Sequence, residues 1–355
     1  MIHFSPGPSQ LYFTVQDHVK SGFRDSIPSI SHRSKAFELI FKETTVGLRE
    51  LLNIPSNYFI VFAGSATEIW ERSIQNLVGD KSHHLVNGAF SKRYYEIALQ
   101  LKKNAGKSEA PMGQSFRDVL IPSGTEMIAL THNETSTGVS LSTDFIHSFK
   151  KENPDCLVVV DAVSSLPYPN FNYNEVDSVF FSVQKGFGLP AGLGVWMVNE
   201  RCLAKAENLL SQGNSIGSYH TLPLLYANAL KNQTPETPNV LGIYLLGKVI
   251  QDFLRKGIIS IRKETEYKAA ILYQALEAHS AIKPFVLDKR DRSKTVIVAG
   301  CGDRTEELSS YLMDRGFSPG EGYGEFKRQH LRFANFPTHS KEQFESLSDV
   351  LSTFK

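Results

Sequence analysis

The most constraining feature of this chain is a series of short, unbroken apolar segments separated by segments with helical periodicity. The apolar segments are "YFIVFAG", "HHLVNG", "EMIALTHNE", "CLVVVDAVSS", "VDSVFFSV" and "GVWMVN". Helical spacing of apolar residues occurs over residues 34–53, 66–77, 90–102 and 143–151. Strands that are apolar throughout are typical of a parallel sheet covered on both faces, so the alternation predicts an α/β fold.

The pattern changes in the last third of the chain. Residues 240–281 are mostly helical, and Gly257 predicts a break between two helices that link two domains. Short strands near 283–287 and 295–299, the strand "HLRFANF" and two further helices then predict a smaller α+β unit. We therefore expect a large domain over residues 1–250, with an N-terminal segment that contributes to the site. We expect the linking helix and the small domain to comprise residues 251–355.

Composition narrows the class of partner. The 355 residues carry a formal net charge of +1, which argues against nucleic acid or a charged membrane surface and favours a small-molecule ligand. No apolar run is long enough to span a bilayer, and the N-terminus does not have the pattern of a secretory leader. The three cysteines are far apart and lack metal-ligand spacing, so we predict a reduced, cytoplasmic protein with no metal site.

Polar residues that follow the apolar runs are the candidates for a site, because ligands of open α/β sheets bind beyond the carboxyl ends of the strands. Ser65 can cap a helix, with Glu68 returning the bond, and the free N–H groups of that helix end suit a phosphate. Phe90 can stack on a flat heterocycle or belong to the core. Asn133, Glu134 and Thr135 can hold a ring substituent.

Asp161 and Lys185 form the most informative pair. Each follows a buried strand, where an unpaired charge suffers desolvation, although a turn aspartate and a solvated loop lysine are the ordinary alternatives. Pyridoxal phosphate needs a lysine for its Schiff base, a carboxylate for its ring nitrogen, a stacking surface and a phosphate cup. The strand ends offer all four.

The ordered motifs "SHR", "AGSAT", "NGAF", "THNET", "VVVDAVSS", "SVQKGFGLPAGLG", "ETPN" and "HLRFANF" span nearly the whole chain. Together they resemble the class V aminotransferases of fold type I, most of all the phosphoserine aminotransferase branch. The resemblance implies a large, mostly parallel seven-stranded sheet domain, a small C-terminal α+β domain, pyridoxal 5'-phosphate as cofactor, and a homodimer with shared active sites.

The resemblance also implies roles for single residues. Lys185 is then the Schiff-base lysine and proton carrier, and Asp161 pairs with the ring nitrogen of the cofactor. Phe90 stands where the family usually stacks a tryptophan, which keeps the π face but loses the indole N–H. The remaining cofactor contacts are Ser65 and Ala66 at the phosphate, Gln184 nearby, Thr135 close to the ring, and Thr237 at the phosphate of the neighbouring subunit's cofactor.

The substrates implied are an amino acid and a 2-oxo acid, with phosphoserine and 2-oxoglutarate, hence serine biosynthesis, as the leading pair. Arg332 matches the arginine that grips the α-carboxylate, and His32 and Arg33 match residues that hold the distal anionic group. The chain departs from the family at Ala66, which replaces an arginine, and at Glu325-Phe326, which replace a His-Arg pair; Lys327 and Arg328 are candidates to compensate.

These departures keep two other reactions open. A different donor, serine or alanine with glyoxylate or pyruvate, is the first. A pyridoxal-phosphate lyase or desulfurase is the second, and it requires a mobile-loop cysteine, for which Cys301 is the nearest candidate. Retention of both Lys185 and Asp161 argues against a non-catalytic binding protein.

Overall fold

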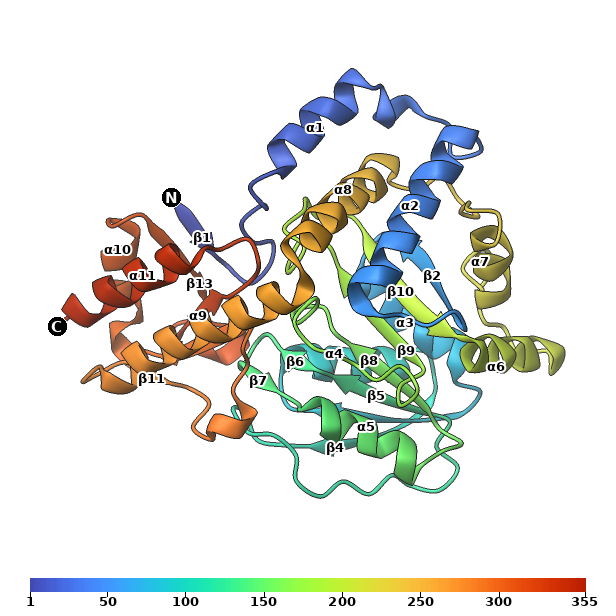
Figure 1. Cartoon of the computed structure of the whole chain (residues 1–355). Coiled ribbons are helices and arrows are strands. Elements are labelled where there is room, and N and C mark those ends of the chain that lie inside the picture. The colour runs from blue at the N-terminus through green and yellow to red at the C-terminus, as the bar shows by residue number, and fades with distance from the viewer.

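A computed structural model describes all residues 1–355, and its centre is a seven-stranded sheet (Figure 1). In spatial order its strands are β2 (Tyr58–Ala63), β10 (Gly194–Asn199), β9 (Ser178–Ser182), β8 (Leu157–Asp161), β5 (Met127–Thr131), β3 (Lys81–Val86) and β4 (Asn104–Glu109). β10 alone runs in the direction opposite to the other six strands. The α/β class and the mostly parallel seven-stranded sheet are therefore confirmed.

Helices cover both faces of this sheet, which explains why its central strands are apolar throughout. One face packs against α2 (Lys35–Leu52), α5 (Thr143–Glu152) and α8 (Val240–Lys256) in a core that includes Ile60 and Phe181. The other face packs against α3 (Ala66–Leu77), α4 (Ala89–Gln100), α6 (Glu200–Ser211) and α7 (Leu222–Ala229), with Val61 and Phe180 turned towards them. Alternate residues of each strand thus serve two different cores.

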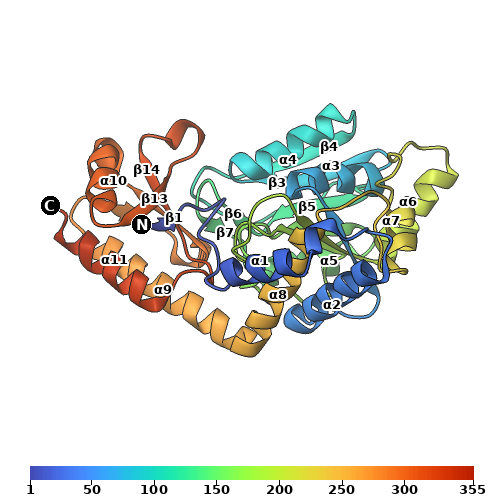
Figure 2. The ribbon, with the colours of Figure 1, turned by 90° about the horizontal axis from the view of Figure 1, so that it is seen from above.

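A second sheet forms the smaller unit. Its strand order is β1 (Ile2–Phe4), β13 (Phe317–Glu321), β14 (His330–Ala334), β12 (Val296–Gly300) and β11 (Lys283–Pro284). The helices α9 (Ile258–Ala278), α10 (Thr305–Met313) and α11 (Lys341–Thr353) pack in its core. Both chain termini lie at this end of the molecule (Figure 2).

The predicted break at Gly257 is present. This residue has φ +83°, a conformation that glycine adopts without the steric cost that a Cβ brings, and it separates α8 from α9. The division of domains at residue 250 stays a prediction, and β1 at the other end of the chain pairs with β13 in the small sheet. From β1 the chain continues through α1 (Val15–Arg24), which lies apart from both sheets in Figure 1, to α2.

The remaining elements are short. The hairpin strands β6 (Asn133–Glu134) and β7 (Val139–Ser140) follow β5, and single 3₁₀ turns occupy Ile27–Ser29, Lys289–Asp291, Gly302–Arg304 and Gly324–Phe326. The sequence pattern does not reveal β4, "NAGKSE", or β13, "FSPGE", because the first is a polar edge strand and the second contains Pro and Gly. None of the helices combines the length and apolar character needed to cross a bilayer.

Candidate functional site

A cavity of about 210 Å³ lies at the carboxyl ends of β5, β8 and β9. Parallel strands deliver their C-terminal residues to the same edge of a sheet, so residues far apart in sequence meet there. Seven of the eight predicted cofactor-binding residues line the cavity: Ser65, Ala66, Phe90, Thr135, Asp161, Gln184 and Lys185.

Lys185 lies three residues beyond the end of β9 and is 8% exposed. Its Nζ lies 5.4 Å from the centre of the Phe90 ring, and only burial and the charges of Asp161, Arg332 and Glu134 act on it, with no hydrogen bond within the chain. Burial disfavours the ammonium form and lowers the pKa of Lys185 to about 8, although the Asp161 carboxylate opposes this shift. The amine is thus available as a nucleophile much nearer neutral pH than an ordinary lysine.

Asp161 is the last residue of β8 and is almost completely buried. Burial raises the pKa of Asp161 to about 6, against the opposing effects of the Val163 N–H, the Trp70 indole N–H and the Lys185 charge. The Val163 N–H donates to Oδ1 at 2.9 Å, and Trp70 Nε1 donates to Oδ2 at 2.8 Å. The two hydrogen bonds therefore fix the orientation of the carboxylate, and its pKa of about 6 lies close to neutral pH.

The N-terminus of α3 forms the predicted helix end at the cavity. Ser65 caps it, with Oγ accepting from the Glu68 N–H at 3.1 Å, but the expected capping box is wrong: the Glu68 carboxylate accepts from the Gly64 N–H instead. The Ala66 N–H donates to Ser182 Oγ at 3.0 Å. Ser182, which the sequence analysis did not single out, therefore belongs to the same part of the cavity. It lies there because Gly194 of β10 pairs with both Ala63 of β2 and Ser182 of β9.

Phe90 and Thr135 close the opposite side of the cavity. The Phe90 ring is close both to Lys185 Nζ, at 5.4 Å, and to the ring of Tyr323, whose centre is 4.9 Å away. The buried Glu134 carboxylate holds the start of α4, because it accepts from the N–H groups of Phe90 and Ser91. Thr135 Oγ1 donates to Ser164 Oγ at 2.8 Å. Of the polar run after β5, Glu134 therefore supports the aromatic wall, while Asn133 and Thr135 line the cavity.

The N-terminal segment completes the cavity. Gly7 and Pro8 line it, and a Cβ at Gly7 would lie only 2.7 Å from Lys185 Cε. The Ser9 N–H donates to the Gln184 carbonyl at 3.1 Å, which attaches this segment to the strand end that carries the lysine. Only the general contribution of the N-terminal segment was predictable, because nothing in "SPGPS" points to a lysine far along the chain.

Arg332 stands beside the cavity and not among its lining residues. Its Nε donates to the Glu321 carbonyl at 2.6 Å and its Nη1 to the Thr135 carbonyl at 3.3 Å. Burial lowers the pKa of Arg332 to about 10, which still leaves it charged at neutral pH. This side chain joins the small sheet to the wall of the cavity.

Besides Arg332, three predicted residues lie outside this cavity. Thr237 lines a separate cavity of about 270 Å³, and His32 is partly exposed just before α2. Arg33 donates to the carbonyls of Thr234 at 2.6 Å and Pro235 at 3.0 Å. Within one chain, these hydrogen bonds therefore hold the "SHR" segment against the segment that carries Thr237. Neither segment lines the cavity that contains Lys185.

Lys327 and Arg328 are the two residues named as candidates to compensate for the missing basic residues. They line another cavity, of about 470 Å³, and Lys327 Nζ lies 3.2 Å from Glu321 Oε2. Their compensating role stays a prediction.

Cys301, the candidate thiol of a desulfurase, is also misplaced for that role. It is buried in the core of the small sheet, and burial raises the pKa of its thiol to about 12. A buried thiol that stays protonated is a poor nucleophile.

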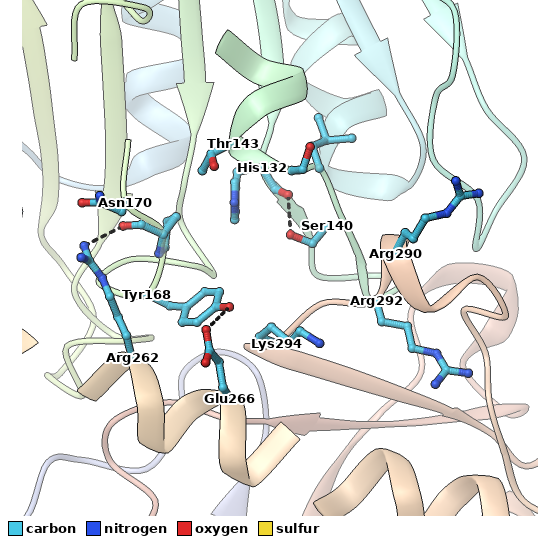
Figure 3. A pocket seen from close by; sticks show the side chains of 13 residues that line it. His132, Ser140, Thr143, Tyr168, Asn170, Arg262, Glu266, Arg290, Arg292 and Lys294 are labelled. Atoms are coloured by element: carbon cyan, nitrogen blue, oxygen red, sulfur yellow. Dashed lines mark hydrogen bonds between the residues drawn. The ribbon is translucent and has the colours of Figure 1, made fainter. Parts of the chain in front are cut away.

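A further cavity of about 350 Å³ lies between the start of α5 and α9 (Figure 3). Its basic residues are largely engaged elsewhere. The guanidinium groups of Arg290 and Arg292 point away from His132 and Tyr168, towards Asp288 and Glu277, and Arg262 donates to the Pro169 carbonyl. Glu266 and Lys294 also face this space, but Glu266 is exposed and Lys294 is only partly buried. This cavity therefore lacks the buried acid and buried amine that distinguish the one at Lys185.

Comparison with known proteins agrees with this geometry. The family model described as aminotransferase class-V matches residues 2–318. A phosphoserine aminotransferase from Rhodococcus opacus is 28% identical over 355 residues, which cover 97% of this chain and 92% of that protein. The crystal structure of a phosphoserine aminotransferase from Cytophaga hutchinsonii is 49% identical, covers 99% of this chain and 98% of its own, and superposes with a TM-score of 0.97.

An aspartate aminotransferase from Thermus thermophilus shares the fold at a TM-score of 0.84 with 22% identity, covering 99% of this chain and 98% of its own. With the strand-end lysine and aspartate in one cavity, these matches make the molecule a fold type I aminotransferase. The chain belongs to the class-V aminotransferase family.

Proposed function

We propose that this aminotransferase uses pyridoxal 5'-phosphate to transfer the amino group of phosphoserine to 2-oxoglutarate. The observation that carries the proposal is the unpartnered Lys185 amine beside the buried Asp161 carboxylate in one cavity. The 49% identity over almost the full length to a protein named as a phosphoserine aminotransferase supports the choice of substrate.

The cavity fits the cofactor. Its floor offers the carboxylate that a pyridinium nitrogen needs, its wall offers the Phe90 ring, and the start of α3 offers N–H groups and a positive dipole end for a phosphate. A carboxylate that no arginine or lysine neutralises by direct contact has room for a new cationic partner. When bound, the cofactor supplies a ring that withdraws electrons and so acidifies the α-proton of the amino acid.

The residues of the chain then have separate tasks. Lys185 would hold the cofactor through its amine and would act as the general base for the α-proton, because its lowered pKa leaves a useful fraction of neutral amine. Asp161 would pair with the ring nitrogen of the cofactor and favour its protonated form. Arg332, whose guanidinium is charged and lies next to the cavity wall, binds the α-carboxylate of the substrate.

We also propose a homodimer with shared active sites and a cytoplasmic location; the free state of all three cysteines supports the latter. The dimer is supported by the position of His32, Arg33 and Thr237, which one chain holds together on a segment away from its own cavity. A second copy could receive these residues at its cofactor phosphate and at the distal group of the substrate. Exposed apolar side chains at Leu11, Phe13 and Phe23 around α1 fit the same arrangement.

The reaction is tested by adding amino acids to purified protein loaded with pyridoxal 5'-phosphate and recording the visible spectrum. We expect phosphoserine to convert the cofactor to its amino form at much lower concentration than serine, alanine, aspartate or glutamate. Conversion by serine or alanine with no response to phosphoserine would replace the substrate with the second candidate, a transaminase that uses glyoxylate or pyruvate.

The shared site is tested by mixing two inactive variants, Lys185→Ala and Arg33→Ala, under conditions that exchange subunits. In a mixed dimer one site carries both changes and the other carries none, so activity should return. If both residues serve a site within one chain, mixing restores nothing.

A further inference from the structure

Trp70 is the one aromatic side chain that hydrogen-bonds to the acid at the floor of the cavity. It lies on α3, one turn beyond the capped end, and is 5% exposed. Its Nε1–H donates to Asp161 Oδ2 at 2.8 Å. An indole N–H can only donate, so this bond forms with an oxygen that keeps a free lone pair, which favours the ionised carboxylate.

The indole is held in place by its packing. Its ring stacks on Tyr94 at a centroid distance of 5.8 Å and an interplanar angle of 19°. The Tyr94 hydroxyl is bonded to Ser73 Oγ at 2.6 Å, which fixes the stacking partner in turn. A donor on a rigid helix and a second donor, the Val163 N–H, together set the plane of the carboxylate.

The charged and titratable groups around Asp161 oppose one another. Lys185 favours ionisation, whereas Glu134 disfavours it, and the nearby Tyr94 hydroxyl is uncharged at neutral pH because burial raises its pKa. Burial itself is the strongest influence and favours the protonated acid. No cation forms a direct ion pair with Asp161, so the neutral donors Trp70 Nε1–H and Val163 N–H are what stabilise its ionised form by direct contact.

We propose that Trp70 is a positioning residue that orients the Asp161 carboxylate towards the ring nitrogen of the cofactor and holds it ionised. This inference rests on the proposed function. Phe90, which we expect to stack on the cofactor, provides a ring without an N–H. The indole N–H of the site comes instead from Trp70 on α3, which donates to Asp161.

The chain allows a direct test because it contains only two tryptophans. The second, Trp196, is equally buried and donates to Ser178 Oγ at 2.7 Å, a partner that does not titrate. Protein labelled with ¹⁵N at the indole therefore gives two N–H resonances, one at a titrating partner and one at a neutral control.

The full chain without cofactor is titrated between about pH 4.5 and 8.5 while both resonances are followed. We expect the Trp70 resonance to move with a midpoint near the Asp161 pKa of about 6, and the Trp196 resonance to stay in place. The shift should disappear in Asp161→Asn. A Trp70 resonance that does not titrate, or that titrates equally in the Asn variant, would overturn the proposal.

Trp70→Phe tests the role in the reaction, since it keeps a ring and removes the N–H. A hydrogen bond to a charged group contributes on the order of 1.5–3 kcal/mol, so we expect kcat to fall roughly 10- to 100-fold with KM nearly unchanged. The acidic limb of the kcat–pH profile should move upwards, because Asp161 becomes harder to ionise.

Trp196→Phe is the matched control and should leave the pH profile where it is. A wild-type kcat and pH profile in Trp70→Phe would contradict the proposal. The NMR titration uses no substrate. If the Trp70 resonance follows the ionisation of Asp161 but the protein does not react with phosphoserine, the proposed reaction is rejected and the role of Trp70 stands.

Discussion

Two lysines of this chain are buried, and they lie in different parts of the molecule. Lys185 stands at the edge of the large sheet, and Lys268 lies on α9 beneath the small sheet. Burial lowers the pKa of both, to about 8 for Lys185 and about 7 for Lys268. By burial and pKa alone, Lys268 would be the stronger candidate for a reactive amine.

Their hydrogen bonds separate the two. Lys268 Nζ donates to the carbonyls of Phe336 at 2.9 Å and His339 at 2.8 Å, so it ties α9 to the segment after β14. Lys185 Nζ has no partner in the chain and faces a cavity that also contains a buried acid. A depressed pKa therefore indicates a reactive lysine only where the amine is also unengaged and has space for a ligand.

The largest effect is expected from Lys185→Ala, which should abolish both transamination and the covalent attachment of the cofactor. Loss of the ammonium removes a burial cost but leaves Asp161 without its nearest positive charge, so the two effects on stability oppose each other. We expect Tm of the cofactor-free protein to stay within about 2 °C of wild type, since about 1 kcal/mol shifts Tm by only one to two degrees in a chain of this size. Measurable turnover in this variant would remove Lys185 from its role.

The rate at which cofactor-free protein captures pyridoxal phosphate should depend on pH around 8. Only the neutral amine attacks, and its pKa is lowered from 10.5 to about 8, so the rate should rise tenfold per pH unit below 8 and level off above it. Stopped-flow absorbance measures the rate. Asp161→Asn should move the midpoint below 8, because the Asp161 charge raises this pKa; a midpoint near 10 would refute the assigned environment.

The stability of the cofactor-free protein should fall as Asp161 ionises. Its folded pKa, about 6, lies above the ordinary 3.8, so the unfolded chain releases this proton first and folding loses free energy as pH rises from about 4 to 6. Relative to Asp161→Asn, wild type should lose up to about 3 kcal/mol, at 1.36 kcal/mol per pKa unit. Denaturant unfolding at pH 4 and pH 7 measures it, and parallel curves for the two proteins would contradict the shift.

The smallest effect concerns Lys268→Met, which keeps the apolar stem and removes the donors. At pH 8 the variant should lose about 2 kcal/mol, since two buried carbonyl groups lose their partner, while cofactor capture by Lys185 is unchanged. Lys263→Ala, on the exposed side of the same helix, is the control and should lie within about 0.5 kcal/mol of wild type. Impaired cofactor capture in Lys268→Met would contradict the assignment of Lys268 to a purely structural role.

The features that were predictable are local ones. Apolar runs and helical periodicity indicated the strands and helices of the large sheet, and Ser65 marked a helix start that the structure caps as expected. Lys185 and Asp161 stood out because a charge at the end of an apolar strand is visible in the sequence itself. Their meeting in one cavity follows from parallel strands, which carry such ends to the same edge.

The sequence by itself thus determined the α/β class and the candidate amine and acid, because both depend on residues close together along the chain. Only the tertiary structure decided the rest. It placed Trp70 against Asp161, Gly7 against Lys185, and Lys268 among carbonyls, and it kept Thr237 and Arg33 away from the cavity of their own chain. These relations join segments separated by tens to hundreds of residues, and packing, not local periodicity, sets the distance between such segments.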